Sequence, residues 1–109
     1  MEKKVKVMGE EVTIRFNMAV ELAYEEITEK PFSLDELKFK KNLMALFMAA
    51  IIANNPNTEI KFEKLLTDAT IDEVNALEAA LVETTTAWFK VPNVIPADKQ
   101  AKDEDAPKN

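Results

Sequence analysis

The chain has 109 residues, 47% of them hydrophobic, and a formal charge of −6 from 20 acidic and 14 basic residues. This length predicts one domain, and the apolar fraction is typical of a globular protein. The chain contains no cysteine and no histidine, which excludes disulfides, thiol nucleophiles and the commonest general base and metal ligand. A net negative charge with Arg15 as the only arginine disfavours nucleic acid as a partner.

Residues 4–16 alternate between apolar and polar side chains, as the strands of a β-hairpin do. The apolar positions lie on both sides of Gly9-Glu10 and are Val5, Val7, Val12, Ile14 and Phe16. The only glycine of the chain lies in the expected turn, where a positive φ is favoured. Because a lone hairpin is marginally stable in water, its apolar face is expected to pack on helices or on a partner's sheet.

A first helix is expected over residues 18–29, with Asn17 as its N-cap and Pro31 just after its end. Its predicted inner stripe consists of Met18, Leu22, Ala23 and Ile27. Three glutamates recur at intervals of four and are expected to share one exposed face, namely Glu21, Glu25 and Glu29. Two interpretations of this face remain open: a solvated surface, or an acidic strip that contacts a basic partner helix.

Every residue from Leu43 to Ala53 is apolar. Leu, Met and Ala favour helix, and a helix that is apolar on all sides is buried, so this segment predicts the central helix of the domain. It is shorter than the roughly 18–20 residues of a membrane span. Ser33 and Glu36 have the spacing of a capping box, which predicts that this helix begins near Leu34. Asn54-Asn55-Pro56 is expected to end it.

A short helix is expected over residues 60–68, followed by a last helix. Thr70 and Glu73 have the spacing of a second capping box and are expected to mark the start of this last helix. The last helix is expected to reach Trp88 or Phe89, and Thr84-Thr85-Thr86 to weaken its final turns. Its predicted inner stripe is Ile71, Val74, Leu77, Leu81 and Trp88. Residues 91–109 are predicted to be a flexible mixed-charge tail. The expected fold is α+β but mainly α: residues 1–90 form a single domain in which an N-terminal β-hairpin packs on about four helices around a buried central helix.

The sequence offers little for catalysis. Adjacent acidic pairs such as Glu25-Glu26 diverge on a helix, and one glycine cannot supply a phosphate-binding loop or a nucleophile elbow. Asp68, Asp72 and Glu73 could hold a divalent cation loosely, but helix capping explains them more simply. We therefore expect a binding protein that is not an enzyme and that needs no cofactor or metal.

Several segments are similar to one family, the tail assembly chaperones of long-tailed bacteriophages and prophages. The likeness is greatest to the short forms from phages and prophages of Bacteroides-type bacteria. The similar segments are Ile14-Arg15-Phe16-Asn17, residues 23–32, the buried helix ending at Ala53-Asn54-Asn55-Pro56, and residues 62–66. Such proteins tend to carry Thr-Gly-Lys after the first helix, where this chain has Thr28-Glu29-Lys30.

The resemblance implies a protein that binds the long, helical tape measure protein until tail tube subunits polymerise around it. In many of these phages a programmed frameshift makes an extended form that also recruits tail tube protein. The implied location is the cytoplasm of the bacterial host, and Met1 to Val5 lack the apolar segment of a secretory signal. No membrane partner is expected, and homo-oligomerisation remains open.

We expect the client to contact the hairpin and the first helix. The candidate partner-binding residues are Phe16, Glu21, Tyr24, Glu25, Glu29 and Phe32. Structural roles for the aromatic residues among them are an open alternative. Two other functions remain in competition: a structural tail completion or connector subunit that polymerises through its hairpin edge, and a small bacterial adaptor or antitoxin-like binding protein.

Overall fold

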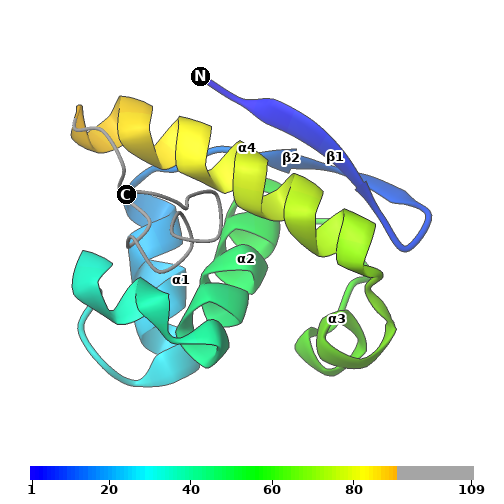
Figure 1. The fold of residues 1–109 in the computed structure, drawn as a ribbon, viewed down its shortest axis with the longest axis horizontal. Coiled ribbons are helices and arrows are strands. Elements are labelled where there is room, and N and C mark those ends of the chain that lie inside the picture. Colours follow the sequence, from blue (N-terminus) through cyan, green and yellow to red (C-terminus); the bar gives the residue numbers. More distant parts are fainter. Residues whose placement is uncertain (91–109) are drawn as a thin grey trace, which may run out of the picture.

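The computed structural model describes residues 1–90 (Figure 1), so the tail predicted for residues 91–109 lies outside the described part. The elements follow the order β1 (Lys3–Val7), β2 (Glu10–Ile14), α1 (Met18–Thr28), the 3-10 helix η1 (Leu34–Lys38), α2 (Lys40–Asn54), α3 (Phe62–Asp68) and α4 (Ile71–Phe89). The predicted α+β fold, mainly helical with an N-terminal hairpin, is confirmed.

Helix α2 is the centre of the domain, as its composition predicts. Its residues from Asn42 to Ile51 are all buried, and α1, η1, α3, α4 and β2 all contact it. The one polar residue in this stretch, Asn42, donates a hydrogen bond from Nδ2 to the Glu36 carbonyl oxygen at 3.1 Å. Because this hydrogen bond satisfies the buried amide, Asn42 costs little stability within the otherwise apolar buried part of α2.

Strands β1 and β2 form an antiparallel hairpin in which Val5 lies opposite Val12. Its turn residues, Met8 and Gly9, have φ values of 51° and 85°, the geometry of the type I′ turn that matches the twist of a hairpin. The predicted positive φ of Gly9 is confirmed. The buried face of the hairpin packs on two helices, because β1 contacts α4 and β2 contacts both α2 and α4.

The predicted inner stripe of α1 is wrong for its first two members. Met18 and Leu22 are 51% and 60% exposed, whereas Val20 and Tyr24 are buried. Tyr24 lies edge-on to Phe32, with ring centroids 5.3 Å apart, and Phe32 in turn contacts Phe16 and Phe89. The Tyr24 face of α1 is buried in place of the Met18 and Leu22 face, because packing Tyr24 into this aromatic cluster buries more apolar area.

The capping box predicted before the central helix does not form. Ser33 makes no side-chain cap, and the Glu36 carboxylate instead accepts from Lys30 Nζ at 3.4 Å and from Asn42 Nδ2 at 3.3 Å. Residues 34–38 form the 3-10 helix η1, and Phe39 is extended, with φ −86° and ψ 127°. The central helix therefore begins at Lys40 and not near Leu34.

The capping box of the last helix is confirmed, with the Thr70 hydroxyl accepting from the Glu73 N–H at 3.1 Å and the Glu73 carboxylate accepting from the Thr70 N–H at 3.0 Å. The predicted inner stripe of α4 is right for Leu77 and Leu81 and wrong for its two ends, since Ile71 and Trp88 are exposed. Helix α4 continues through residues 84–86 to Phe89, as predicted, and Thr84 and Thr85 are buried; the weakening of these turns stays a prediction. Helix α3 begins at Phe62, two residues later than predicted.

Candidate functional site

The structure does not gather the candidate partner-binding residues on one surface. The Phe16 and Tyr24 side chains are 3% and 0% exposed and belong to the aromatic cluster inside the domain. In this conformation neither ring can contact a partner, so the prediction is corrected for these two residues. Phe32 is half-buried beside them and joins the loop after α1 to the last turn of α4 through its stacking with Phe89.

The glutamates of α1 do not form a uniform solvated face. Glu25 is half-buried, and its carboxylate accepts a hydrogen bond from the Phe32 N–H at 3.0 Å, which fixes the loop after the helix. Glu29 is exposed and ends the helix in the left-handed conformation, with φ 59°. Glu21 is half-buried near the start of the helix. The exposed side of α1 is instead partly apolar, because Met18 and Leu22 lie on it.

The outer edge of β2 is closed at Thr13 by the end of α2. Asn55 Oδ1 accepts from the Thr13 N–H at 2.9 Å, and Asn55 Nδ2 donates to the Thr13 carbonyl oxygen at 2.9 Å. Asn54 Nδ2 donates to the Arg15 carbonyl oxygen at 2.8 Å. The Asn55 amide thus satisfies Thr13 as a neighbouring strand would, and this edge cannot pair with another chain without losing these bonds.

The outer edge of β1 is open. In a hairpin with a two-residue turn, the pair that closes the turn is hydrogen-bonded and the pairs then alternate. Val7 and Glu10 close the turn, so the backbone groups of Lys4 and Lys6 point away from β2. The bonds of Asn55 to Thr13, which lies opposite Lys4, show the same alternation on β2. Within residues 1–90, no group outside the hairpin bonds the N–H or C=O of Lys4 or Lys6.

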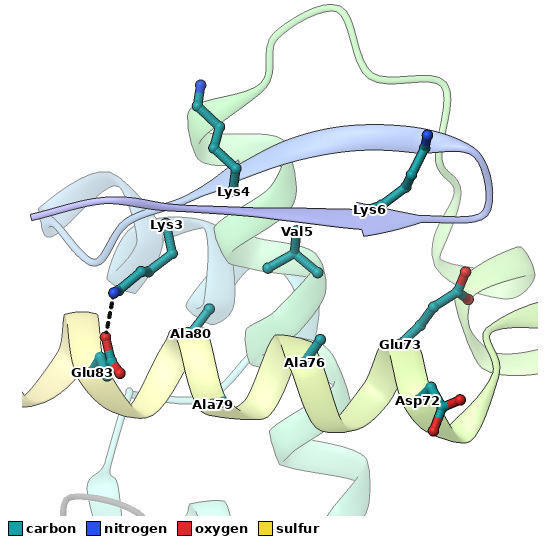
Figure 2. A pocket seen from close by; sticks show the side chains of 10 residues that line it. All are labelled: Lys3, Lys4, Val5, Lys6, Asp72, Glu73, Ala76, Ala79, Ala80 and Glu83. Atoms are coloured by element: carbon teal, nitrogen blue, oxygen red, sulfur yellow. Dashed lines mark ion pairs between the residues drawn. The ribbon is translucent and has the colours of Figure 1, made fainter.

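A groove of about 550 Å³ follows this open edge, between β1 and α4 (Figure 2). Val5 points down toward α4, where Ala76, Ala79 and Ala80 line the groove, while Lys4 and Lys6 point to the opposite side of the strand. The small side chains of the alanines leave the space between the helix and the strand edge unfilled. We call this feature, with the open edge of β1 above it, the edge groove.

Two contacts with α4 hold the ends of the edge groove. Lys3 Nζ lies 2.7 Å from Glu83 Oε1, and the Met8 N–H donates to Glu73 Oε2 at 3.0 Å. The backbone hydrogen bond from Thr70, followed by the one from Met8, lowers the pKa of Glu73 below its usual value. The Glu73 carboxylate thus links the start of α4 to the hairpin turn, and β1 is fixed above α4 at both ends.

A second hollow, of about 340 Å³, lies between α1, α2 and α3, and its apolar lining comes from Ile27, Ala45, Phe62 and Leu66. For metal binding the described residues offer no group of three or more potential ligands among Asp and Glu side chains. None of the helices in residues 1–90 combines the length and apolar character needed to cross a membrane.

No protein-family model matches the sequence, and no curated protein or solved structure is significantly similar to it. Sequence reasoning missed the edge groove and treated Asn54-Asn55 only as a helix end. One signal for the open edge was available: exposed lysines alternating along a strand are typical of an unpaired edge.

Proposed function

We propose that this protein is a non-catalytic tail assembly chaperone of a phage or prophage, which holds the tape measure protein until tail tube subunits polymerise around it. The family resemblance suggests this role, and the open edge of β1 is the observation that supports it. An unpaired strand edge presents N–H and C=O groups that can bind another polypeptide backbone. A protein that exposes such an unpaired strand edge is suited to binding another polypeptide chain.

Helix α1 supplies a second surface that fits the role. Met18 and Leu22 are four residues apart on one side of the helix and both are exposed. Exposed apolar residues at this spacing can cover the apolar stripe of a helical client. The net charge of −6 would keep such a complex soluble while that stripe is covered.

The open edge also favours one competing function, a structural tail subunit that polymerises through its hairpin. Antiparallel pairing of two copies of β1 through their open edges, in the register centred on Val5, would place Lys4 of one copy opposite Lys6 of the other, on one face of the joint sheet. Like charges directly opposite each other destabilise strand pairing. In that register the lysines of β1 repel each other, which favours a chaperone that binds a different chain over a subunit that pairs with itself.

Co-expression with the tape measure protein encoded nearby tests the proposal. We expect more soluble tape measure protein and a complex that elutes as one peak in size-exclusion chromatography. We also expect the protein to be absent from purified particles, because a chaperone leaves before the tail is complete. Unchanged solubility without a complex, or the protein found as a stoichiometric component of finished tails, would overturn the proposal.

A further inference from the structure

The open edge of β1 has the geometry to accept one further strand. The outward N–H and C=O groups belong to Lys4 and Lys6, which are two residues apart, and this spacing matches the repeat of an extended chain. Glu73 bonds the Met8 N–H at one end of this edge, and Lys3 pairs with Glu83 at the other. The accessible stretch is therefore the length of β1 itself, and its occupant is an extended segment.

The side of the added strand that faces α4 has to be apolar and of modest size. Its side chains would lie beside Val5, above Ala76, Ala79 and Ala80. Ala76 and Ala79 are exposed in this structure, so a covering strand would bury them. Residues such as valine, alanine or threonine match the space between the strand edge and the helix, and valine and threonine also favour extended backbone.

The other side of the added strand would meet the lysines of β1. Lys6 has no ion pair within residues 1–90. The ammonium of Lys4 donates to the exposed side of the hairpin, to Thr13 Oγ1 at 3.0 Å, and lies 3.9 Å from the exposed Glu2, so an acidic residue opposite Lys4 would compete with these two contacts. Lys3, by contrast, points toward α4 and pairs with Glu83. Acidic residues at the positions opposite Lys4 and Lys6 would form cross-strand pairs, and basic residues there would be repelled.

We propose that the edge groove binds an extended segment of the client as a third strand next to β1, with acidic residues opposite Lys4 and Lys6 alternating with small apolar residues that face α4. This inference rests on the proposed function for the identity of the client and adds how that client is recognised. Backbone pairing supplies the binding, while the lysines select the charge of the segment.

Two synthetic peptides test this proposal, acetyl-Thr-Glu-Val-Glu-Val-Glu-Thr-amide and the same peptide with lysine in place of each glutamate. We expect the glutamate peptide to bind saturably and to slow hydrogen exchange at the amides of Lys4 and Lys6. The amides of Val5 and Val7 should change little because they already pair with β2. The lysine peptide should bind at least about tenfold more weakly.

A charge reversal provides the matched comparison. The double variant Lys4→Glu and Lys6→Glu should prefer the lysine peptide, whereas Lys40→Glu and Lys61→Glu, which make the same charge change at exposed positions outside the hairpin, should bind as the wild type does. Circular dichroism confirms that each variant is folded. If each double variant binds the two peptides equally well, the proposal is overturned. It is also overturned if the protein without peptide forms a concentration-dependent dimer in which the amides of Lys4 and Lys6 are protected from hydrogen exchange, because the occupant of the edge is then a second copy.

The same variants in co-expression separate this inference from the proposed function. If the wild type and the Lys4→Glu, Lys6→Glu variant solubilise the tape measure protein equally well, the edge groove is not the binding site, but the chaperone function stands. If the wild type itself has no effect on the tape measure protein, the chaperone function fails, and the peptide experiment still decides whether the edge groove binds strands of the expected charge.

Discussion

Replacing Asn55 by alanine tests whether the end of α2 holds the hairpin in place. The side chain makes two hydrogen bonds to the backbone of Thr13, both 2.9 Å long, and a third to the Ile51 carbonyl oxygen at 2.8 Å. Thr13 and Asn55 are 42 residues apart along the chain. The amide therefore joins the central helix to β2 and closes the outer edge of β2 at Thr13.

The expected loss follows from these contacts. A hydrogen bond contributes on the order of 0.5–1.5 kcal/mol to stability, and the low end applies where water can replace the lost partner. Asn55 is half-buried, so water reaches the Thr13 backbone once the amide is gone. Three bonds near the low end amount to about 2 kcal/mol. For a domain of this size, such a loss lowers the melting temperature by roughly 10 °C.

Urea unfolding followed by circular dichroism measures this loss. Asn57→Ala is the matched control, because Asn57 is exposed and its side chain has no hydrogen bond within residues 1–90. The control should unfold as the wild type does. An Asn55→Ala variant within about 0.5 kcal/mol of the wild type, less than a single hydrogen bond, would refute the view that Asn55 closes the β2 edge.

Three further substitutions test single contacts. Tyr24→Phe removes a buried hydroxyl that has no hydrogen-bond partner within residues 1–90, so the free energy of unfolding should stay the same or rise by up to about 1 kcal/mol. Burial, with a contribution from Glu36, raises the pKa of Tyr24 above 10.0; the wild type should therefore lose more stability than the variant between about pH 8 and pH 11 in urea unfolding. Glu29→Gly relieves the left-handed φ of 59° and should add about 1 kcal/mol in thermal unfolding, whereas Glu26→Gly, inside α1, should lose a similar amount. Glu73→Gln removes a carboxylate whose pKa lies below its usual 4.5; the stability from this group is present above 4.5 and lost as the pH falls through the lowered pKa, so the variant should lose less than the wild type between about pH 6 and pH 3.

A specific result would contradict each of these three predictions. A destabilised Tyr24→Phe variant would mean that the hydroxyl has a partner, such as a buried water molecule. A Glu29→Gly variant no more stable than the wild type would show that the end of α1 carries no backbone strain. A Glu73→Gln variant as acid-sensitive as the wild type would show that the charge of Glu73, with its bonds from Thr70 and Met8, does not stabilise the fold.

The sequence predicted correctly those elements that are determined by residues close together along the chain. The alternation around Gly9 specified the hairpin and its buried face, and Thr70 with Glu73 specified the start of α4. The apolar segment from Leu43 to Ala53 specified the central helix, because a helix that is apolar on all sides is stable in water only where it is buried; Ile52, at 42% exposed, is the exception.

Other features depend on which segments meet in space, and no local pattern shows this. In α1 both Met18 with Leu22 and Val20 with Tyr24 have helical spacing, and only the aromatic cluster decides which pair is buried. The spacing of Ser33 and Glu36 fits a capping box, but Lys30 and Asn42 occupy the Glu36 carboxylate instead.

The candidate site was predictable only as a region. The hairpin and α1 remain the proposed binding elements, but the aromatic residues chosen there are largely interior, since large rings are as valuable to a core as to an interface. The alternating lysines of β1 indicate an unpaired edge, but no local pattern shows that Ala76, Ala79 and Ala80 of α4 lie beneath that edge or that Asn55 reaches Thr13 on the opposite edge.

The packing of the hairpin on α4 also determines when the domain can fold. The Met8 N–H and its Glu73 acceptor are 65 residues apart, and a hairpin alone is marginal in water. A nascent chain that has emerged only as far as residue 70 has β1, β2 and α2 but lacks the helix that covers β1. We therefore expect β1 to stay uncovered during synthesis until α4 leaves the ribosome, and folding to be slower than in helical bundles of this size, whose contacts are mostly local.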